Sequence, residues 1–135
     1  MAPSLLTLLG QVNGLAPQRS KKSDGTIGDT AHATRASDHN PWVMDGGTGI
    51  VTAMDITHDP QGGCDANNLA EAIRQTRDPR VKYVIWNRQI VSSTVSPWTW
   101  RAYAGSNPHT KHMHISVRPE KPSYASEENW QGLAV

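Results

Sequence analysis

The chain has 135 residues, and its 13 Lys and Arg against 12 Asp and Glu give a net charge of +1. This length fits one domain that buries a core without disulfides or structural metals. The balanced charge gives no electrostatic footprint for nucleic acid or an anionic membrane, so we expect neither as a partner. No apolar run approaches the ~20 residues that span a bilayer. A single cysteine, Cys64, excludes an internal disulfide.

The N-terminal stretch predicts an amphipathic helix over residues 5–12, with Ser4 as its N-cap. The leucine-rich run at 5–9 resembles a short signal h-region, but no Lys or Arg precedes it and polar residues follow at once. We therefore assign it to the domain and expect no signal peptide.

The middle of the chain alternates loops with one strand and one helix. Residues 17–30 are polar and predict a loop, and the Gly-rich stretch 45–49 predicts a long irregular connection. Residues 50–57 are rich in β-branched side chains and predict a strand. Asp65 is placed to N-cap a helix over about 66–77.

Three further strands are expected at 81–86, 89–93 and 111–117, the first two joined by the two-residue turn Asn87–Arg88. Helices and sequential strands without a regular βαβ alternation indicate an α+β domain. We expect one domain over residues 1–135, with a core at about 5–118 and a polar tail, 119–135, that wraps the surface.

Strand alternation places the candidate site residues on faces. Residues two apart share a face of a strand, so His112, His114 and Ser116 point away from the apolar set between them. Asp55 similarly lies opposite its apolar neighbours, and His39 lies in a loop. Two strands and a loop would then converge on one ion.

Imidazole nitrogen and carboxylate oxygen are ligands that zinc prefers, and a catalytic zinc site has three protein ligands and an open position for water. His39, Asp55 and His114 would supply three ligands, with His112 beside them. The alternative is that the histidines are ordinary surface residues of an edge strand and that Asp55 pairs with an arginine. The His-x-His pattern alone favours that alternative; the combination with Ser37-x-His39 and an Asp in a strand is more specific.

Four stretches, 23–29, 37–41, 54–60 and 108–117, resemble the zinc D-alanyl-D-alanine carboxypeptidases and L-alanyl-D-glutamate endopeptidases, which share a structural group with lysostaphin-type enzymes and the hedgehog domain. The resemblance is closest to peptidase domains of endolysins from phages of actinobacteria. It implies a small antiparallel sheet with flanking helices. It also implies a monomeric, zinc-dependent hydrolase of peptidoglycan stem peptides, with endopeptidase activity favoured. Such a protein is made in the host cytoplasm and acts on the cell wall after release by another agent, during lysis.

The resemblance also implies roles for individual residues. His39, Asp55 and His114 would hold zinc, Ser37 would help to bind substrate, and His112 would sit beside the zinc water as the catalytic base.

Two arginines, Arg35 and Arg19, are candidates for clamping a substrate carboxylate with a bidentate fork, although each is equally explained as solvated surface.

The chain departs from the family's pattern in two ways. The spacing between His39 and Asp55 is longer, and Lys111 stands where many members have an acidic base. Asp38 and His109 are further candidates for the base. We expect structural or supporting roles for His32, His58 and His109, although any one of them is a possible substitute for a ligand.

Two other functions stay open. Lys111 favours a non-catalytic, zinc-containing module that binds the cell wall. A third possibility is a hydrolase that uses Cys64 and a histidine, which thiol-alkylating agents would inactivate and chelators would spare.

Overall fold

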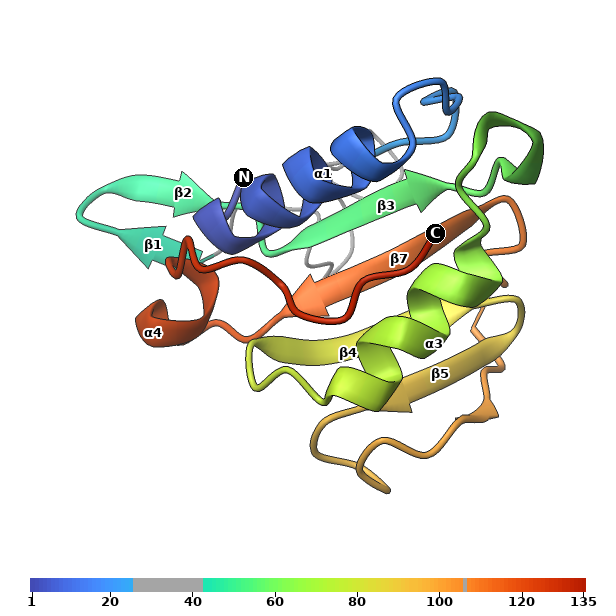
Figure 1. Cartoon of the computed structure of the whole chain (residues 1–135). Coiled ribbons are helices and arrows are strands. Elements are labelled where there is room, and N and C mark those ends of the chain that lie inside the picture. Colours follow the sequence, from blue (N-terminus) through green and yellow to red (C-terminus); the bar gives the residue numbers. More distant parts are fainter. Residues whose placement is uncertain (26–42, 106) are drawn as a thin grey trace.

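The computed structural model describes residues 1–25, 43–105 and 107–135. It confirms an α+β fold with antiparallel sheets (Figure 1). A five-stranded sheet has the order β3-β7-β4-β5-β6, and β1 and β2 form a separate two-stranded sheet. The strands are β1 (Val43–Asp45), β2 (Thr48–Ile50), β3 (Ala53–Thr57), β4 (Val81–Trp86), β5 (Gln89–Ser92), β6 (Arg101–Ala102) and β7 (His112–Val117). The helices are α1 (Pro3–Leu15), η1 (Pro60–Gly62), α3 (Ala66–Thr76) and α4 (Lys121–Tyr124). Of the described helices, none is long and apolar enough to cross a membrane.

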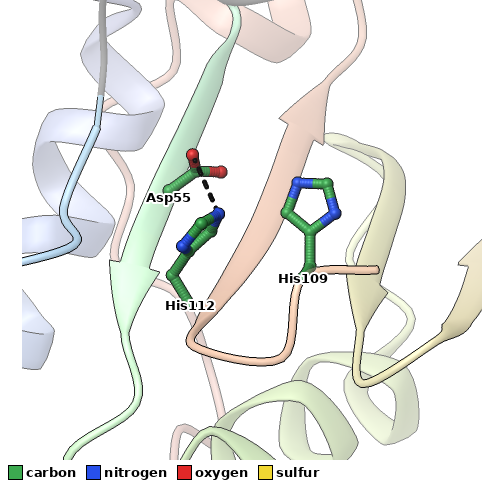
Figure 2. Close-up of side chains that lie close together, drawn as sticks. All are labelled: Asp55, His109 and His112. Carbon is green, nitrogen blue, oxygen red and sulfur yellow. Dashed lines mark ion pairs between the residues drawn. The ribbon is translucent and has the colours of Figure 1, made fainter. Parts of the chain in front are cut away.

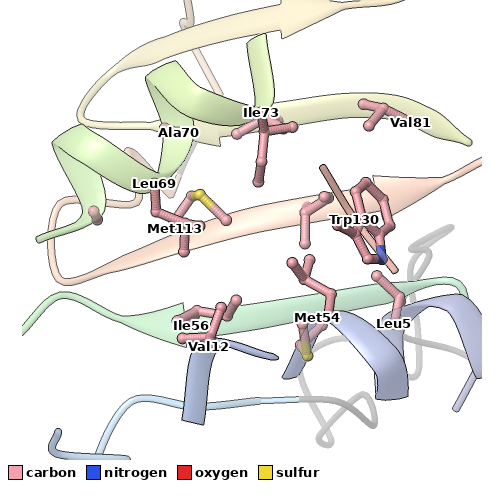
Figure 3. Close-up of a cluster of buried hydrophobic side chains, with 14 of the residues drawn as sticks. Leu5, Val12, Met54, Ile56, Leu69, Ala70, Ile73, Val81, Met113 and Trp130 are labelled. Carbon is pink, nitrogen blue, oxygen red and sulfur yellow. The ribbon is translucent and has the colours of Figure 1, made fainter. Parts of the chain in front are cut away.

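The core lies between the large sheet and the two long helices, α1 and α3, which cover the same face (Figures 1 and 3). Alternate residues of the central strands supply its floor, because successive side chains of a strand point to opposite faces. The largest fully buried members are Leu5, Leu8, Val12, Met54, Ile56, Leu69, Ile73, Val81, Val84, Val91, Met113 and Ile115. The residues between them on β3 and β7 therefore face away from the helices.

The helix starts follow local chemistry. The expected Ser4 cap was wrong: α1 begins at Pro3, its cap residue is Ala2, and no side chain caps it. Proline suits the first helical position because the N–H that it lacks would have no partner there. The expected Asp65 cap is confirmed, since its side chain accepts a hydrogen bond of 2.8 Å from Asn67 N at the start of α3.

Two hairpins use backbone conformations with positive φ. The Asn87–Arg88 turn is confirmed, with φ of 50° and 67°. The irregular connection expected at 45–49 was wrong, because β1 and β2 pair around Gly46–Gly47, with φ of 58° and 92°. Two-residue hairpin turns of this kind need positive φ at both positions, which glycine adopts without strain.

The C-terminal tail runs largely exposed over the surface, but it anchors two aromatic side chains in the core. Tyr124 and Trp130 are each only 4% exposed, and both lie in the main hydrophobic cluster. Trp130 Nε1 donates to the Ser4 carbonyl at 2.9 Å, and the Arg80 guanidinium lies 4.2 Å from the Trp130 ring centroid. Two large aromatic side chains in an otherwise polar segment account for this difference from the expectation.

Candidate metal centre

Asp55 and His114 lie directly opposite each other on the neighbouring strands β3 and β7. Asp55 Oδ1 is 3.1 Å from His114 Nδ1, and both side chains are buried. The face assignment made from strand alternation is therefore confirmed for both residues. On the other ring nitrogen, His114 Nε2 lies 2.8 Å from Ser116 Oγ, two residues along the same strand.

His112 adds a second imidazole at the beginning of β7. Its Nε2 lies 3.5 Å from Asp55 Oδ2 (Figure 2). Both ring nitrogens of His112 are buried, and neither has a hydrogen-bond partner within the described part of the chain. Buried polar groups are normally hydrogen-bonded. Two buried ring nitrogens without a hydrogen-bond partner are therefore consistent with a role in binding a metal ion.

His109 supplies a third imidazole from the loop before β7. Its ring centroid lies 5.1 Å from that of His112 at 90°, and 5.1 Å from that of His114 at 64°. The residue is 7% exposed, and its Nδ1 is another buried nitrogen without a partner among residues 1–25, 43–105 and 107–135. Figure 2 shows His109 and His112 reaching toward the same space beside Asp55.

The position of His109 depends on the hairpin turn between β4 and β5. Asn87 N donates to the His109 carbonyl and Arg88 N to the Pro108 carbonyl, each at 2.9 Å. His109 itself has a φ of 53°, and its N–H donates to Asn107 Oδ1 at 3.0 Å. A non-glycine residue with positive φ is uncommon and is strained, and such strain clusters at functional sites.

Burial, together with the neighbouring His114 and His112, lowers the pKa of His109 to about 4, although Asp55 opposes the shift. His109 is therefore neutral near pH 7. A neutral imidazole has a lone pair on one ring nitrogen, and this lone pair can bind a metal ion or accept a proton.

The fit to a metal ion rests on these geometries. Asp55, His109 and His112 each offer a ligand atom, and the three atoms lie within 4.8 Å of one another. Two ligand atoms of a tetrahedral zinc, each about 2.0–2.1 Å from the ion, are about 3.3 Å apart. The 3.1 Å between Asp55 and His114 is close to that separation. One carboxylate and several imidazoles, some with ring nitrogens that lack a hydrogen-bond partner, form a donor set that could hold a transition-metal ion.

Gly25 closes the other side of Asp55. Its N–H donates to the Asp55 carbonyl at 3.3 Å, and Asp55 N donates back to the Gly25 carbonyl at 2.7 Å. A Cβ at Gly25 would lie 3.4 Å from Asp55 Oδ2, so the glycine passes close to the carboxylate. These two backbone bonds fix the main chain of Asp55, while His114 contacts its carboxylate.

Arg19 is used internally. Its guanidinium donates to both carboxylate oxygens of Asp24, at 3.0 and 2.8 Å, and its Nε donates to Asn13 Oδ1 at 2.9 Å. The Arg19 side chain has no exposed surface. This arrangement accounts for Arg19 without a substrate and leaves its expected role as a carboxylate clamp without support.

Three other candidates from the sequence, His39, Ser37 and Arg35, lie outside the described residues, as do Asp38 and His32. His39 as a zinc ligand and Ser37 and Arg35 as substrate-binding residues therefore stay predictions.

His58 and Cys64 lie apart from the imidazole cluster. His58 Nδ1 accepts a hydrogen bond from Ala66 N at 3.0 Å, at the start of α3, which is a structural role. Cys64 is fully buried in the core, and burial raises the pKa of its thiol. A raised pKa disfavours the nucleophilic thiolate, so nothing here supports a cysteine hydrolase.

Comparisons with protein-family models, with curated proteins and with solved structures each find no match to this chain. The geometry of the cluster and the sequence motifs are therefore what indicates a function.

Proposed function

We propose that the protein is a zinc-dependent peptidase that hydrolyses peptidoglycan stem peptides, with an L-Ala–D-Glu endopeptidase favoured over a D-Ala–D-Ala carboxypeptidase. The observation that carries the proposal is the buried Asp55 carboxylate with the imidazoles of His112 and His114 on its own side of the sheet. The hedgehog-like variety of the α+β fold, the endolysin role and action on the wall after release rest on the motif resemblance alone.

Within this proposal, Asp55 and His114 are zinc ligands and His39 is the third. Ser116 supports the assignment of His114. If Ser116 Oγ accepts the Nε2 proton at 2.8 Å, Nδ1 presents its lone pair toward Asp55 Oδ1. Two acceptors that face each other repel unless a cation or a proton lies between them. Ligating histidines typically donate their other ring N–H to a partner, which fixes the tautomer.

The unused nitrogens of His112 and His109 suit proton transfer. Zinc, when bound, would supply a Lewis acid that polarises a peptide carbonyl and activates water. His112 lies 3.5 Å from Asp55 Oδ2 and acts as the general base, a contribution of typically about 10²-fold or more. His109 is neutral at pH 7 and is held beside His112, where it can orient that ring or a water molecule. Ser37 and Arg35 remain our candidates for binding the substrate.

Metal content and cell-wall lysis, measured together, test the proposal. We expect about one zinc per chain and lysis of purified walls in the wild type, and loss of both in Asp55→Asn. Asp65→Asn is the matched control, because Asn is as good an N-cap as Asp and the residue lies outside the cluster. Lysis that survives without zinc would overturn the proposal.

The alternative is a wall-binding module that holds zinc without catalysis. One observation favours it. Lys111 stands where the family often has an acidic base, and it is exposed. Its backbone carbonyl accepts a hydrogen bond from His58 N. Zinc and wall binding without any cleared zone would support this alternative.

A further inference from the structure

A row of paired residues crosses the whole five-stranded sheet, on the face that carries Asp55 and the imidazoles of the candidate metal site. Directly paired residues of antiparallel strands share a face. The row runs through Asp55, His114, Ile85, Ile90 and Arg101, one residue on each strand from β3 to β6. Arg101 thus stands at the far end of the row that begins at Asp55. Its neighbour Trp100 confirms the direction, since Trp100 Nε1 donates to Glu71 Oε2 of α3 on the opposite face.

Arg101 has no acidic partner. Several other arginines in the described part of the chain have one: Arg19 pairs with Asp24, Arg74 with Glu71, Arg80 with Asp78 and Arg118 with Glu120. The side chain of Arg101 has neither an ion pair nor a hydrogen bond to any described residue, and its Nε is buried without an acceptor. A buried charged donor without a partner is costly, which makes it a ready site for an incoming anion.

Tyr103 connects Arg101 with the imidazole cluster. Residues 101 and 103 are two apart in an extended segment that pairs beside the β4–β5 hairpin. The Tyr103 ring lies 6.3 Å from that of His109, edge to face, and His109 contacts His112. A chain of ring contacts therefore leads from His112 through His109 to Tyr103, two residues from Arg101.

We propose that Arg101 binds a carboxylate of the peptide substrate, at a subsite on the same sheet face as the metal centre. The inference rests on the proposed function and names a specificity determinant for it. A guanidinium recognises a carboxylate through two parallel hydrogen bonds, which are stronger than hydrogen bonds between neutral groups. Arg101 is partly exposed, so a ligand can reach it, while the sheet holds its buried side.

The geometry limits where this carboxylate lies along the substrate. Four strand spacings of about 4.8 Å separate Asp55 from Arg101, or about 19 Å between their backbones. An extended peptide covers about 3.3–3.6 Å per residue, and the arginine side chain shortens the gap. The recognised carboxylate therefore belongs to a residue about four or five positions from the metal centre, as in a branched or cross-linked stem peptide.

A titration of ¹⁵N-labelled, zinc-loaded protein tests the subsite. The probes are a synthetic cross-linked stem peptide with free carboxylates and versions in which each carboxylate is amidated in turn. Protein amide shifts report affinity, and peptide resonances report hydrolysis in the same tube. Arg101→Gln removes the charge, Arg101→Lys keeps it without the fork, and Arg88→Gln is the control, because Arg88 is an exposed arginine on the nearby turn.

We expect Arg101→Gln to weaken binding by about 10-fold or more, Arg101→Lys to be intermediate, and Arg88→Gln to match wild type. Amidation of one particular carboxylate should weaken binding to wild type equally and should have no further effect on Arg101→Gln. Equal affinity of wild type for every amidated peptide would overturn the subsite even if the variant failed to fold. Binding that depends on the carboxylate, without hydrolysis, would support the Arg101 subsite and refute the proposed peptidase activity. Hydrolysis of peptides whose binding does not depend on the carboxylate would support the peptidase activity and refute the subsite.

Discussion

Asp55 Oδ1 lies 3.1 Å from His114 Nδ1 across the β3–β7 pair, and Ser116 Oγ holds the other nitrogen of that imidazole at 2.8 Å. His114 is thus fixed from two sides, whereas neither ring nitrogen of His112 has a hydrogen-bond partner among the described residues, and its Nε2 lies 3.5 Å from Asp55 Oδ2. Because of this difference, we assign His114 as a metal ligand and His112 as the base, and the assignment can be tested directly.

His114→Ala and His112→Ala should have different effects. We expect His114→Ala to lose zinc and lysis together, because it removes a ligand. His112→Ala should retain about one zinc per chain and lose about 10²-fold or more in turnover, because it removes only the base. Elemental analysis and initial rates on the same preparations measure both.

The reverse result for zinc would assign the metal differently. If His112→Ala loses zinc and His114→Ala keeps it, the ion is held by Asp55, His109 and His112, whose ligand atoms lie within 4.8 Å of one another. His58→Ala serves as the control histidine, since His58 contacts the start of α3 instead of the cluster.

The Arg19–Asp24 pair should govern part of the acid stability. Burial alone would raise the pKa of Asp24, but hydrogen bonds from Arg19 and Thr57 outweigh it and hold the pKa below the ordinary 3.8. A lowered pKa in the folded state stabilises the protein above pH 3.8, and this stabilisation is lost as the pH falls toward the folded-state value. Asp24→Asn should lower the free energy of unfolding by about 3 kcal/mol near pH 7, because it leaves the buried guanidinium unpaired.

Urea unfolding at pH 6 and at pH 2.5 checks the sign. The difference between wild type and Asp24→Asn should be large at pH 6 and should shrink at pH 2.5, because the stabilisation from Asp24 is lost as the pH falls below 3.8 toward its lowered pKa. Asp45→Asn, which affects an exposed pair with Lys121, should give a smaller loss at pH 6. A difference that does not vary with pH would refute the role of the ion pair.

Trp130 should be essential for stability although it lies five residues from the end of the described chain. Trp130→Ala removes a buried ring and its hydrogen bond to Ser4, and we expect a loss of about 3–5 kcal/mol. Val95→Ala, at a side chain that is 54% exposed, should change stability by less than about 0.5 kcal/mol. Thermal unfolding distinguishes them, and similar midpoints would show that the tail is not part of the core.

The turn between β4 and β5 should act on catalysis through His109. Asn87→Val places a β-branched residue at a φ of 50°, which should strain the turn by about 1–2 kcal/mol and shift the N–H that holds the His109 carbonyl. We expect zinc to stay bound and the rate to fall about 10-fold or more, since small misplacements are costly. Asn87→Gly keeps the positive φ and should stay near the wild-type rate; equal losses in both variants would point to the Asn87 side chain instead.

The strand period predicted a large part of the site. Alternation alone placed His112 and His114 on one face of a strand and Asp55 on the matching face of another, and the structure confirms this. Sequence reasoning did not predict which strands are neighbours. That pairing depends on contacts between residues almost sixty positions apart, for which a single sequence carries no local signal.

The sequence offered His109 as a further candidate base or a substitute ligand but favoured a supporting role for it, and the reason is physical. Its position is set by a left-handed backbone and by hydrogen bonds from a distant hairpin turn, neither of which has a periodic signature. The Asn107–Pro108 turn signal directly before it was the available hint, since Asn favours local side-chain-to-backbone hydrogen bonds. The same limit applies to Trp130, whose burial follows from packing against α1 and not from the composition of the tail.

The alternation along β7 has a consequence for how the chain finds its native state. Met113 and Ile115 face the helices, while His112 and His114 face the candidate metal site. A shift of β7 by one residue against β3 would place the imidazoles in the apolar core and a methionine beside Asp55. Only the native register would create the metal site. Zinc binding measured during refolding would then indicate that β3 and β7 have paired in the native register, without an enzymatic assay.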